Sequence, residues 1–230
     1  MSTHSGKQTG QKVVVACRVM EPELKKVSKG HNGVKIRYLD QGLHRTPQDM
    51  AGLVQEEIDQ AAKSAKRIVL AYGLCSNGIV GVSARQQGLI VPRCHDCIAF
   101  FLGSPAAYQE AFKDRPGTYY LTPGWVAEKK DPLGIVENDY APRFGWDTAV
   151  WVMEEELKHY SHIALIDTGV TDLAPLRQRA LENARVFHKE YEEIQGRRLK
   201  YFSKIIRGPY PPDDFITLKA GETVTQEMFL

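Results

Sequence analysis

RIVLAYGLCSNG, residues 67–78, joins the clearest strand candidate of the chain to a tight loop. Residues 67–72 form a short apolar run without Gly or Pro, which is typical of a buried, central strand. Residues 73–78 contain two glycines, a serine and an asparagine, and this composition predicts a turn. Cys75 lies in that turn, just beyond the end of the predicted strand.

Similar apolar runs, separated by segments with helical spacing, occur on both sides of this stretch. We expect strands at residues 13–16, 34–39, 89–91, 117–121, 162–166, 199–205 and 215–218. We expect helices at residues 23–28, 46–66, 149–160 and 173–195, and one that starts at Ile98. Met50, Val54 and Ile58 give the second of these helices an apolar stripe. Residues 129–145 are rich in loops and would form either a lid or a surface excursion.

Strands that alternate with helices predict an α/β fold. We expect a doubly wound, mostly parallel sheet with helices on both faces, which is a Rossmann-like three-layer arrangement. Residues 12–219 are expected to form a single α/β domain, preceded by a flexible tail at residues 1–11 and followed by a C-terminal tail at residues 220–230. A chain of 230 residues can bury such a core without disulfide bonds.

Charge and hydropathy exclude several classes of partner. The formal net charge of +2 is too small to indicate nucleic acid binding. No apolar run approaches the roughly 20 residues of a membrane helix, and the polar N-terminus lacks the apolar core of a signal peptide. We therefore expect a cytoplasmic protein with reduced cysteines that binds neither nucleic acid nor membrane. The edge-like strand at residues 34–39 and the moderate charge permit a homodimer.

All four cysteines follow predicted strands. Cys17 follows the first strand, Cys75 the third, and Cys94 and Cys97 the fourth. The carboxyl ends of parallel strands share one edge of a sheet, and ligands bind there in open α/β folds, so we expect these thiols to converge. Three or four soft thiolates at one point are typical of zinc or an iron–sulfur cluster. His95 is two residues before Cys97 and can bind the same metal or orient a ligand.

Two other interpretations of the cysteines stay open. Cys94 and Cys97 form a lone CxxC motif, which a thioredoxin-like redox dithiol also contains. Free cysteines are among the most buried residue types, so the four thiols can also be small core side chains. No pair has the spacing of a zinc finger, and zinc, a cluster, a redox dithiol and plain core packing remain as alternatives.

Several other side chains near the same sheet edge are candidates for binding a substrate. They are His44, Asn77, Arg93, Tyr120 and Trp125. A capping or core role is the alternative for His44. The backbone around Asn77 can form an anion nest or a plain turn, and it lacks the Gly-Lys-Ser/Thr of a phosphate loop. Trp125 can line a cleft or simply pack beside it.

Six motifs are distinctive when they are taken together. They are Cys17 with Glu23-Leu24, Gly42-Leu43-His44, YGLCSNG at 72–78, PRCHDC at 92–97, Gly103-Ser104 and PGTYYLTPGW at 116–125. In these motifs the chain, over about residues 12–218, resembles the family catalogued as domain of unknown function 1638. The resemblance implies cysteines at Cys17, Cys75 and Cys97 and a histidine at His95, whereas the position of Cys94 is commonly apolar in relatives. It therefore implies a three-thiolate site, and an association with corrinoid-dependent methyl transfer.

Two classes of function follow from such a site. In an enzyme, three thiolates leave one metal position open for a small-molecule substrate. Zinc there would activate a thiol for corrinoid-linked methyl transfer, and a [4Fe–4S] cluster would act as a Lewis acid, as in iron–sulfur lyases or desulfidases. In a non-catalytic metal or cofactor carrier, His95 closes a four-ligand site. The partner is then a small molecule or a protein of the corrinoid system.

Overall fold

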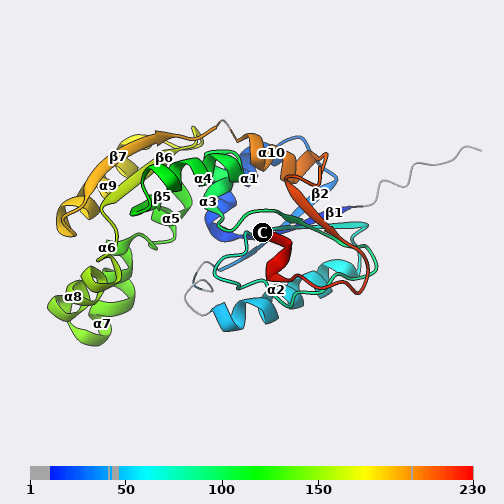
Figure 1. The fold of residues 1–230 in the computed structure, drawn as a ribbon, viewed down its shortest axis with the longest axis horizontal. Helices are drawn as coiled ribbons and strands as arrows, with labels where there is room; N and C mark the ends of the chain where they lie inside the picture. The colour runs from blue at the N-terminus through cyan, green and yellow to red at the C-terminus, as the bar shows by residue number, and fades with distance from the viewer. Residues whose placement is uncertain (1–10, 41, 43–46, 198, 230) are drawn as a thin grey trace, which may run out of the picture.

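Two β-sheets form the framework of the protein, in a computed structural model that describes residues 11–40, 42, 47–197 and 199–229 (Figure 1). The larger sheet has five strands in the order β2-β1-β3-β4-β8, and the smaller has three in the order β5-β6-β7. All neighbouring strands are parallel except β4 and β8. The expected Rossmann-like α/β fold is therefore confirmed.

The five-stranded sheet contains the first four strands and the last one. They are β1 (Lys12–Cys17), β2 (Val34–Leu39), β3 (Arg67–Ala71), β4 (Leu89–Pro92) and β8 (Phe215–Leu218). Cys17 pairs with Leu39, and Ala16 pairs with Ala71, so these strands end at the same level. β1 and β3 are almost completely buried, as their continuous apolar runs predict.

The three-stranded sheet consists of β5 (Thr118–Leu121), β6 (His162–Asp167) and β7 (Glu190–Gln195). The strands of the chain thus form two separate sheets, and β5, β6 and β7 do not extend the five-stranded sheet. The reason is that β8 pairs antiparallel with β4 and covers the edge that β5 would otherwise extend. Figure 1 shows the smaller sheet and α9 at one side of the molecule, away from the five-stranded sheet.

Helices cover both faces of the larger sheet. Their bounds are α1 Glu21–Ser28, α2 Pro47–Ala62, α3 Ile98–Leu102, α4 Pro105–Asp114, α5 Pro123–Ala127, α6 Pro132–Ile135, α7 Ala141–Phe144, α8 Trp146–Glu156, α9 Leu173–Val186 and α10 Lys200–Arg207. In Figure 1, α2 lies on one side of this sheet, and α1 and α10 lie on the other. α2 contacts β1 and β3, whereas α1 packs against α10. None of the helices in the described part of the chain combines the length and apolar character that a membrane crossing needs.

Three of the expected elements are wrong. The helix expected at residues 173–195 ends at Val186, and β7 follows it, because His188 turns the backbone with a positive φ of 53°. The strand expected at residues 199–205 is α10, whose buried side chains repeat with a helical spacing: Tyr201, Phe202, Ile205 and Ile206. Residues 129–145 are not a loop. They form α6, a π-helical turn at Val136–Tyr140 and α7.

Residues 220–229 fold back onto the larger sheet. Val224 exchanges backbone hydrogen bonds with the strand-like segment at Val82 and Gly81, and a short 3₁₀ turn, Gln226–Phe229, follows. Val224 and Phe229 are both buried. Residues 1–10 of the expected N-terminal tail lie outside the described residues, and the division of the chain into domains stays a prediction.

Candidate functional site

Three cysteines converge at the carboxyl edge of the five-stranded sheet. Cys17 is the last residue of β1, Cys75 lies in the loop after β3, and Cys97 directly precedes α3 in the loop after β4. All three are buried. The Cys97 thiol donates a hydrogen bond to the Cys75 sulfur, and this contact, together with burial and the charge of Asp96, raises the pKa of Cys97. The three cysteines therefore lie at the strand ends named in the sequence analysis, and their role as ligands stays a prediction.

Tyr72 joins Cys17 to the other two thiols. Its ring and hydroxyl group are buried and lie beside the Cys17 sulfur. Burial raises its pKa, and the nearby sulfurs of Cys17, Cys75 and Cys97 raise it further. All three sulfurs therefore lie within electrostatic range of a single phenol.

Two loops interlock to hold Cys75 and Cys97 together. The backbone N–H of Leu74 donates to the carbonyl of Cys94 at 2.9 Å, and that of Cys75 donates to the carbonyl of His95 at 3.0 Å. A Cβ atom at Gly73 would lie 2.9 Å from the carbonyl carbon of Asp96. Only glycine therefore fits at this position without a shift of the backbone.

The loop after β3 is strained at the cysteine. Cys75, Ser76 and Asn77 have φ angles of 48°, 56° and 66°, so three successive non-glycine residues are left-handed. Each such residue costs about 1–2 kcal/mol relative to the right-handed form. The turn is closed by the N–H of Gly78, which donates to the carbonyl of Cys75 at 3.0 Å. Strain of this kind is concentrated at functional sites.

A pocket of about 360 Å³ opens onto two of the thiols. Cys75 and Cys97 both line it, and most of the other lining side chains are aromatic: Tyr108, Phe112, Tyr119, Tyr120, Trp125 and Tyr160. Trp125 packs edge-on against Phe101 of α3, with the ring centroids 6.1 Å apart. The volume suits a small molecule.

The predicted substrate-binding residues lie in different places. Tyr120 and Trp125 line the thiol pocket. Asn77 is exposed and is not among the residues that line this pocket. Arg93 instead donates hydrogen bonds to the carbonyls of Pro212, at 3.0 Å, and Met228, so it holds together the segments before and after β8. His44 lies outside the described residues.

His95 does not join the thiols through its side chain. The imidazole is exposed and lines a separate cavity of about 340 Å³, together with Arg93, Cys94 and residues of α4. Its contribution to the thiol pocket is the backbone carbonyl that accepts from Cys75. Cys94 lines the same separate cavity, and burial raises its pKa. Cys94 and Cys97 therefore face different cavities.

Tyr72, Tyr108 and Tyr160 are site residues that the sequence analysis did not select. Tyr72 falls at the end of a strand, where its apolar neighbours indicate core packing. Tyr108 lies on α4 and Tyr160 follows α8, and neither position follows a strand. The exposed face of α4, with Tyr108 and Phe112 four residues apart, was the one available signal for an aromatic surface.

Glu23 is a buried acid beside this site. Its carboxylate accepts a hydrogen bond of 2.7 Å from the hydroxyl of Thr168, which follows β6, and its other oxygen has no partner among the described residues. Burial raises its pKa to about 7. Glu23 on α1 thus ties the five-stranded sheet to the end of the three-stranded one.

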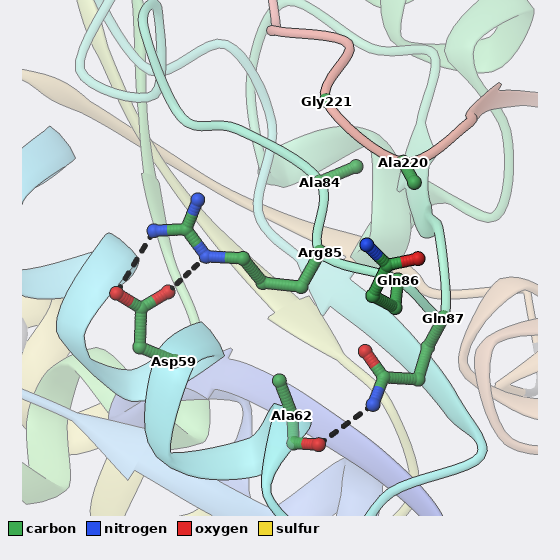
Figure 2. Close-up of a pocket in the computed structure, with 8 residues that line it drawn as sticks. All are labelled: Asp59, Ala62, Ala84, Arg85, Gln86, Gln87, Ala220 and Gly221. Atoms are coloured by element: carbon green, nitrogen blue, oxygen red, sulfur yellow. Dashed lines mark hydrogen bonds and ion pairs between the residues drawn. The ribbon is translucent and has the colours of Figure 1, made fainter.

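Another cavity, of about 390 Å³, lies at the opposite edge of the large sheet (Figure 2). Asp59 and Arg85 form a two-pronged ion pair across it, with contacts of 2.6 and 2.9 Å. The side chain of Gln87 donates to the carbonyl of Ala62 at 2.6 Å. The charged and polar groups of this cavity thus find their hydrogen-bond partners within the protein. No cysteine lines the cavity. We therefore place the candidate site at the thiols.

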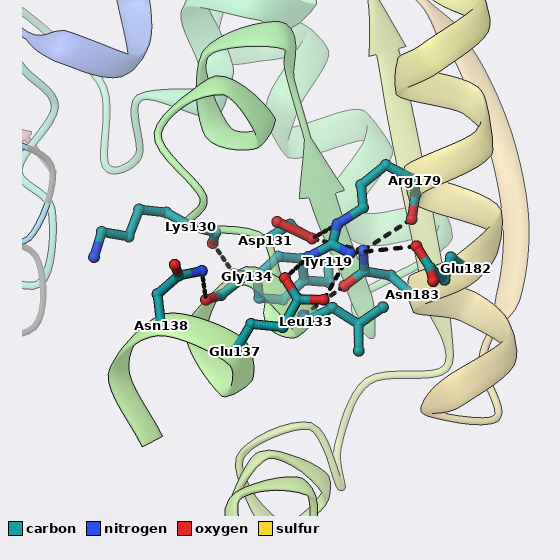
Figure 3. A network of polar contacts seen from close by, with 10 residues as sticks. All are labelled: Tyr119, Lys130, Asp131, Leu133, Gly134, Glu137, Asn138, Arg179, Glu182 and Asn183. Atoms are coloured by element: carbon teal, nitrogen blue, oxygen red, sulfur yellow. Dashed lines mark hydrogen bonds and ion pairs between the residues drawn. The ribbon is translucent and has the colours of Figure 1, made fainter. Parts of the chain in front are cut away.

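A buried polar network joins α9 to the helical segment at α6 (Figure 3). Asp131 accepts hydrogen bonds from Arg179 at 2.6 Å and from Asn183 at 2.7 Å. Asn183 in turn accepts from the N–H of Leu133 at 2.8 Å. Arg179 also contacts the more exposed Glu137. Tyr119, which lines the thiol pocket, donates to the carbonyl of Lys130 at 3.5 Å beside this network, and the network positions the segment that contains α6.

A metal site requires several ligand side chains arranged around one point. Among the described residues, no group of three or more His, Cys, Asp or Glu side chains is arranged to hold a metal ion. The chemistry of the donors is nevertheless that of a soft-metal site, because three buried thiols, from the end of β1 and from the loops after β3 and β4, all lie within electrostatic range of Tyr72.

A family model described as "Protein of unknown function (DUF1638)" matches residues 38–206. The chain belongs to this family. The match includes Cys75, Cys97 and the pocket-lining tyrosines of this DUF1638 protein, whereas Cys17 and Glu23 precede it. No curated protein and no solved structure matches the chain.

Proposed function

We propose that this DUF1638 protein is an enzyme in which Cys17, Cys75 and Cys97 bind one soft-metal centre, either zinc or a [4Fe–4S] cluster. The observation that carries the proposal is the contact between Cys75 and Cys97, with the sulfurs of Cys17, Cys75 and Cys97 all within electrostatic range of Tyr72. Thiols from separate loops satisfy the preference of zinc and of iron–sulfur clusters for sulfur ligands. The reducing cytoplasm is the compartment in which such thiols stay available.

The position of His95 favours an open metal site over a closed one. Its side chain is exposed and lines a different cavity, so it does not supply a fourth ligand from where it lies. Cys75 and Cys97 instead line a pocket that can admit a small molecule. An open position facing a pocket is typical of catalytic centres, whereas a carrier site is closed.

The bound metal would supply a Lewis acid at the base of the pocket. The residues of this chain supply the rest: Tyr72 lies beside the sulfur of Cys17, the aromatic side chains border the pocket, and the strained loop fixes Cys75. Methyl transfer to a substrate thiol and lyase or desulfidase chemistry are the reaction classes that this arrangement suits.

Metal analysis of protein purified without oxygen tests the proposal. We expect one zinc ion or one cluster per chain, distinguished by elemental analysis and by the visible absorption that only a cluster gives. Cys75→Ser and Cys97→Ser should lose the metal, whereas the matched control Cys94→Ser should keep it. A protein that stays metal-free after anaerobic reconstitution with zinc, or with iron and sulfide, contradicts the proposal. Equal loss in the control points to four thiolate ligands.

The same contact favours one alternative, a redox dithiol. Cys97 is in hydrogen-bond contact with Cys75, whereas Cys94 faces a different cavity, so Cys75 and Cys97 are the pair that this alternative favours. Treatment of metal-free protein with oxidised dithiothreitol would then form a Cys75–Cys97 disulfide, with the two electrons and two protons passing to the reagent. Peptide mapping identifies the bonded pair. A disulfide that forms readily in protein without bound metal favours the redox function.

A further inference from the structure

The lining of the thiol pocket has an unusual balance of charge. Its side chains include four tyrosines, a tryptophan and a phenylalanine, and Asp96 is the one charged residue among them. No lysine, arginine or histidine lines the pocket within the described part of the chain. Arg115, which lies close to Tyr120, forms an ion pair with Glu192 outside it. An anionic ligand would therefore find no oppositely charged side chain in this lining.

The aromatic rings come from three directions. Tyr108 lies on α4, Tyr120 on β5, and Tyr160 after α8. Tyr108 and Tyr120 are inclined by 55° with centroids 6.5 Å apart, and Tyr119 packs edge-on against Tyr160 at 5.5 Å. The rings thus border the pocket at different inclinations instead of stacking in one plane. Aromatic rings that border a pocket in this way form a box, and they can offer their negative faces to a cation.

Asp96 adds a full negative charge to this box. Its carboxylate accepts the N–H of Ile98 at 2.7 Å, which fixes its position at the start of α3. Its charge reaches three of the tyrosines, since it contributes to the raised pKa of Tyr108, Tyr120 and Tyr160, after the larger effect of burial. A carboxylate within an aromatic box is the arrangement that recognises alkylated ammonium ions.

We propose that the pocket lined by Asp96, Tyr108, Tyr119, Tyr120, Trp125 and Tyr160 binds a small methylated ammonium ion. This inference rests on the proposed function only in taking the pocket as the substrate pocket. Methyl groups on the nitrogen spread the charge and remove hydrogen-bond donors, so the ligand binds through ring faces and one carboxylate. The volume of about 360 Å³ limits the ligand to a small molecule.

Titration calorimetry with choline and with its neutral isostere, in which carbon replaces the ammonium nitrogen, tests the inference on the purified full chain. We expect choline to bind roughly tenfold or more tightly than the isostere, because only the charge differs. Equal affinity for the two compounds would show an apolar pocket without cation recognition and would overturn the inference. So would the absence of binding to either compound.

Variants distinguish the contribution of the aromatic rings to choline binding from that of the tyrosine hydroxyl groups. Tyr120→Leu and Asp96→Asn should each weaken choline binding roughly tenfold, whereas Tyr120→Phe should change it less than about twofold, since the ring is retained. Asparagine can still accept the N–H of Ile98, so α3 keeps its first hydrogen bond. Asp59→Asn, which removes a carboxylate from the cavity of Figure 2, is the matched control and should bind choline normally. Equal weakening in this control contradicts a local role for Asp96.

Metal content is measured on the same samples. If the protein takes up no metal but binds choline, the result supports this inference and overturns the proposed metal centre. Metal-loaded protein that binds neither compound overturns this inference alone.

Discussion

Thr168 donates a hydrogen bond of 2.7 Å to Glu23, and this single contact connects the ends of the two sheets. Thr168 follows β6 of the smaller sheet, and Glu23 lies on α1, which packs on the larger one. Both side chains are buried. The contact also makes the joint between the sheets sensitive to protonation, because the pKa of Glu23 is raised to about 7.

Glu23→Gln should remove a pH dependence of stability. The folded protein keeps a proton on Glu23 up to about pH 7, whereas the unfolded chain releases it near the ordinary pKa of 4.5. As the pH rises from about 4.5 to 7, the free energy of unfolding of the wild type should therefore fall by on the order of 3 kcal/mol relative to the variant. Above about pH 7 the difference between the two proteins should stay constant. Urea unfolding of both proteins across this range measures the difference. Glu21→Gln, on the same helix but less buried, is the control, and a difference that is constant with pH would contradict the prediction.

Gly73→Ala should destabilise the protein by about 1–3 kcal/mol, because its Cβ meets the backbone of Asp96 and Cys97. Gly52→Ala is the matched control. It lies within α2 with nothing near its Cβ position, and it should stabilise the protein by about 0.5–1 kcal/mol. Thermal unfolding followed by circular dichroism compares the two. Similar stability changes in both variants would show that the loops do not interlock as described.

Ser76→Gly should stabilise the protein by up to about 1 kcal/mol, because glycine adopts a positive φ without the Cβ penalty. Ser64→Gly, at a position without a positive φ, should instead lower the free energy of unfolding by about 0.5–1 kcal/mol. Chemical denaturation of both variants gives the free energies. If the strain serves the site, Ser76→Gly should also bind less metal than the wild type. A loss of stability at Ser76 would contradict the left-handed turn.

Asp131→Ala should cost about 3–5 kcal/mol of unfolding free energy, because Arg179 and the buried Asn183 both lose their shared acceptor (Figure 3). Glu137→Ala removes a more exposed partner of the same arginine and should cost less than about 1 kcal/mol. Equilibrium unfolding in urea distinguishes the two. Equal costs would mean that burial does not determine the strength of this network.

The convergence of the cysteines could be predicted because it depends on one rule. Cys17, Cys75 and Cys97 follow parallel strands, and parallel strands end at one edge. The placement of His95 could not be predicted, because it lies in a turn, where side chains do not alternate regularly between two faces. The interlocking of residues 73–75 with residues 94–97 orients the His95 carbonyl toward Cys75 and leaves the imidazole exposed.

The errors in the fold have local causes. His188 starts a new strand through a positive φ, and neither Gly nor Pro marks that point. Ile205 and Ile206 favour a strand by composition, but with Tyr201 and Phe202 they form the buried face of a helix. The aromatic pocket was missed for a different reason. Tyr108 and Tyr160 reach it only because the chain builds a second sheet, which local patterns do not specify.

The antiparallel pairing of β4 with β8 has a consequence for synthesis on the ribosome. Arg93, next to the end of β4, is held by residues 119 and 135 positions later in the chain. At about 5–20 residues per second, the outer edge of β4 stays unpaired for on the order of ten seconds while the rest is translated. During that interval the emerging chain presents a bare strand edge beside reduced cysteines. Until β8 is translated, that edge is open to pairing with a strand of another chain.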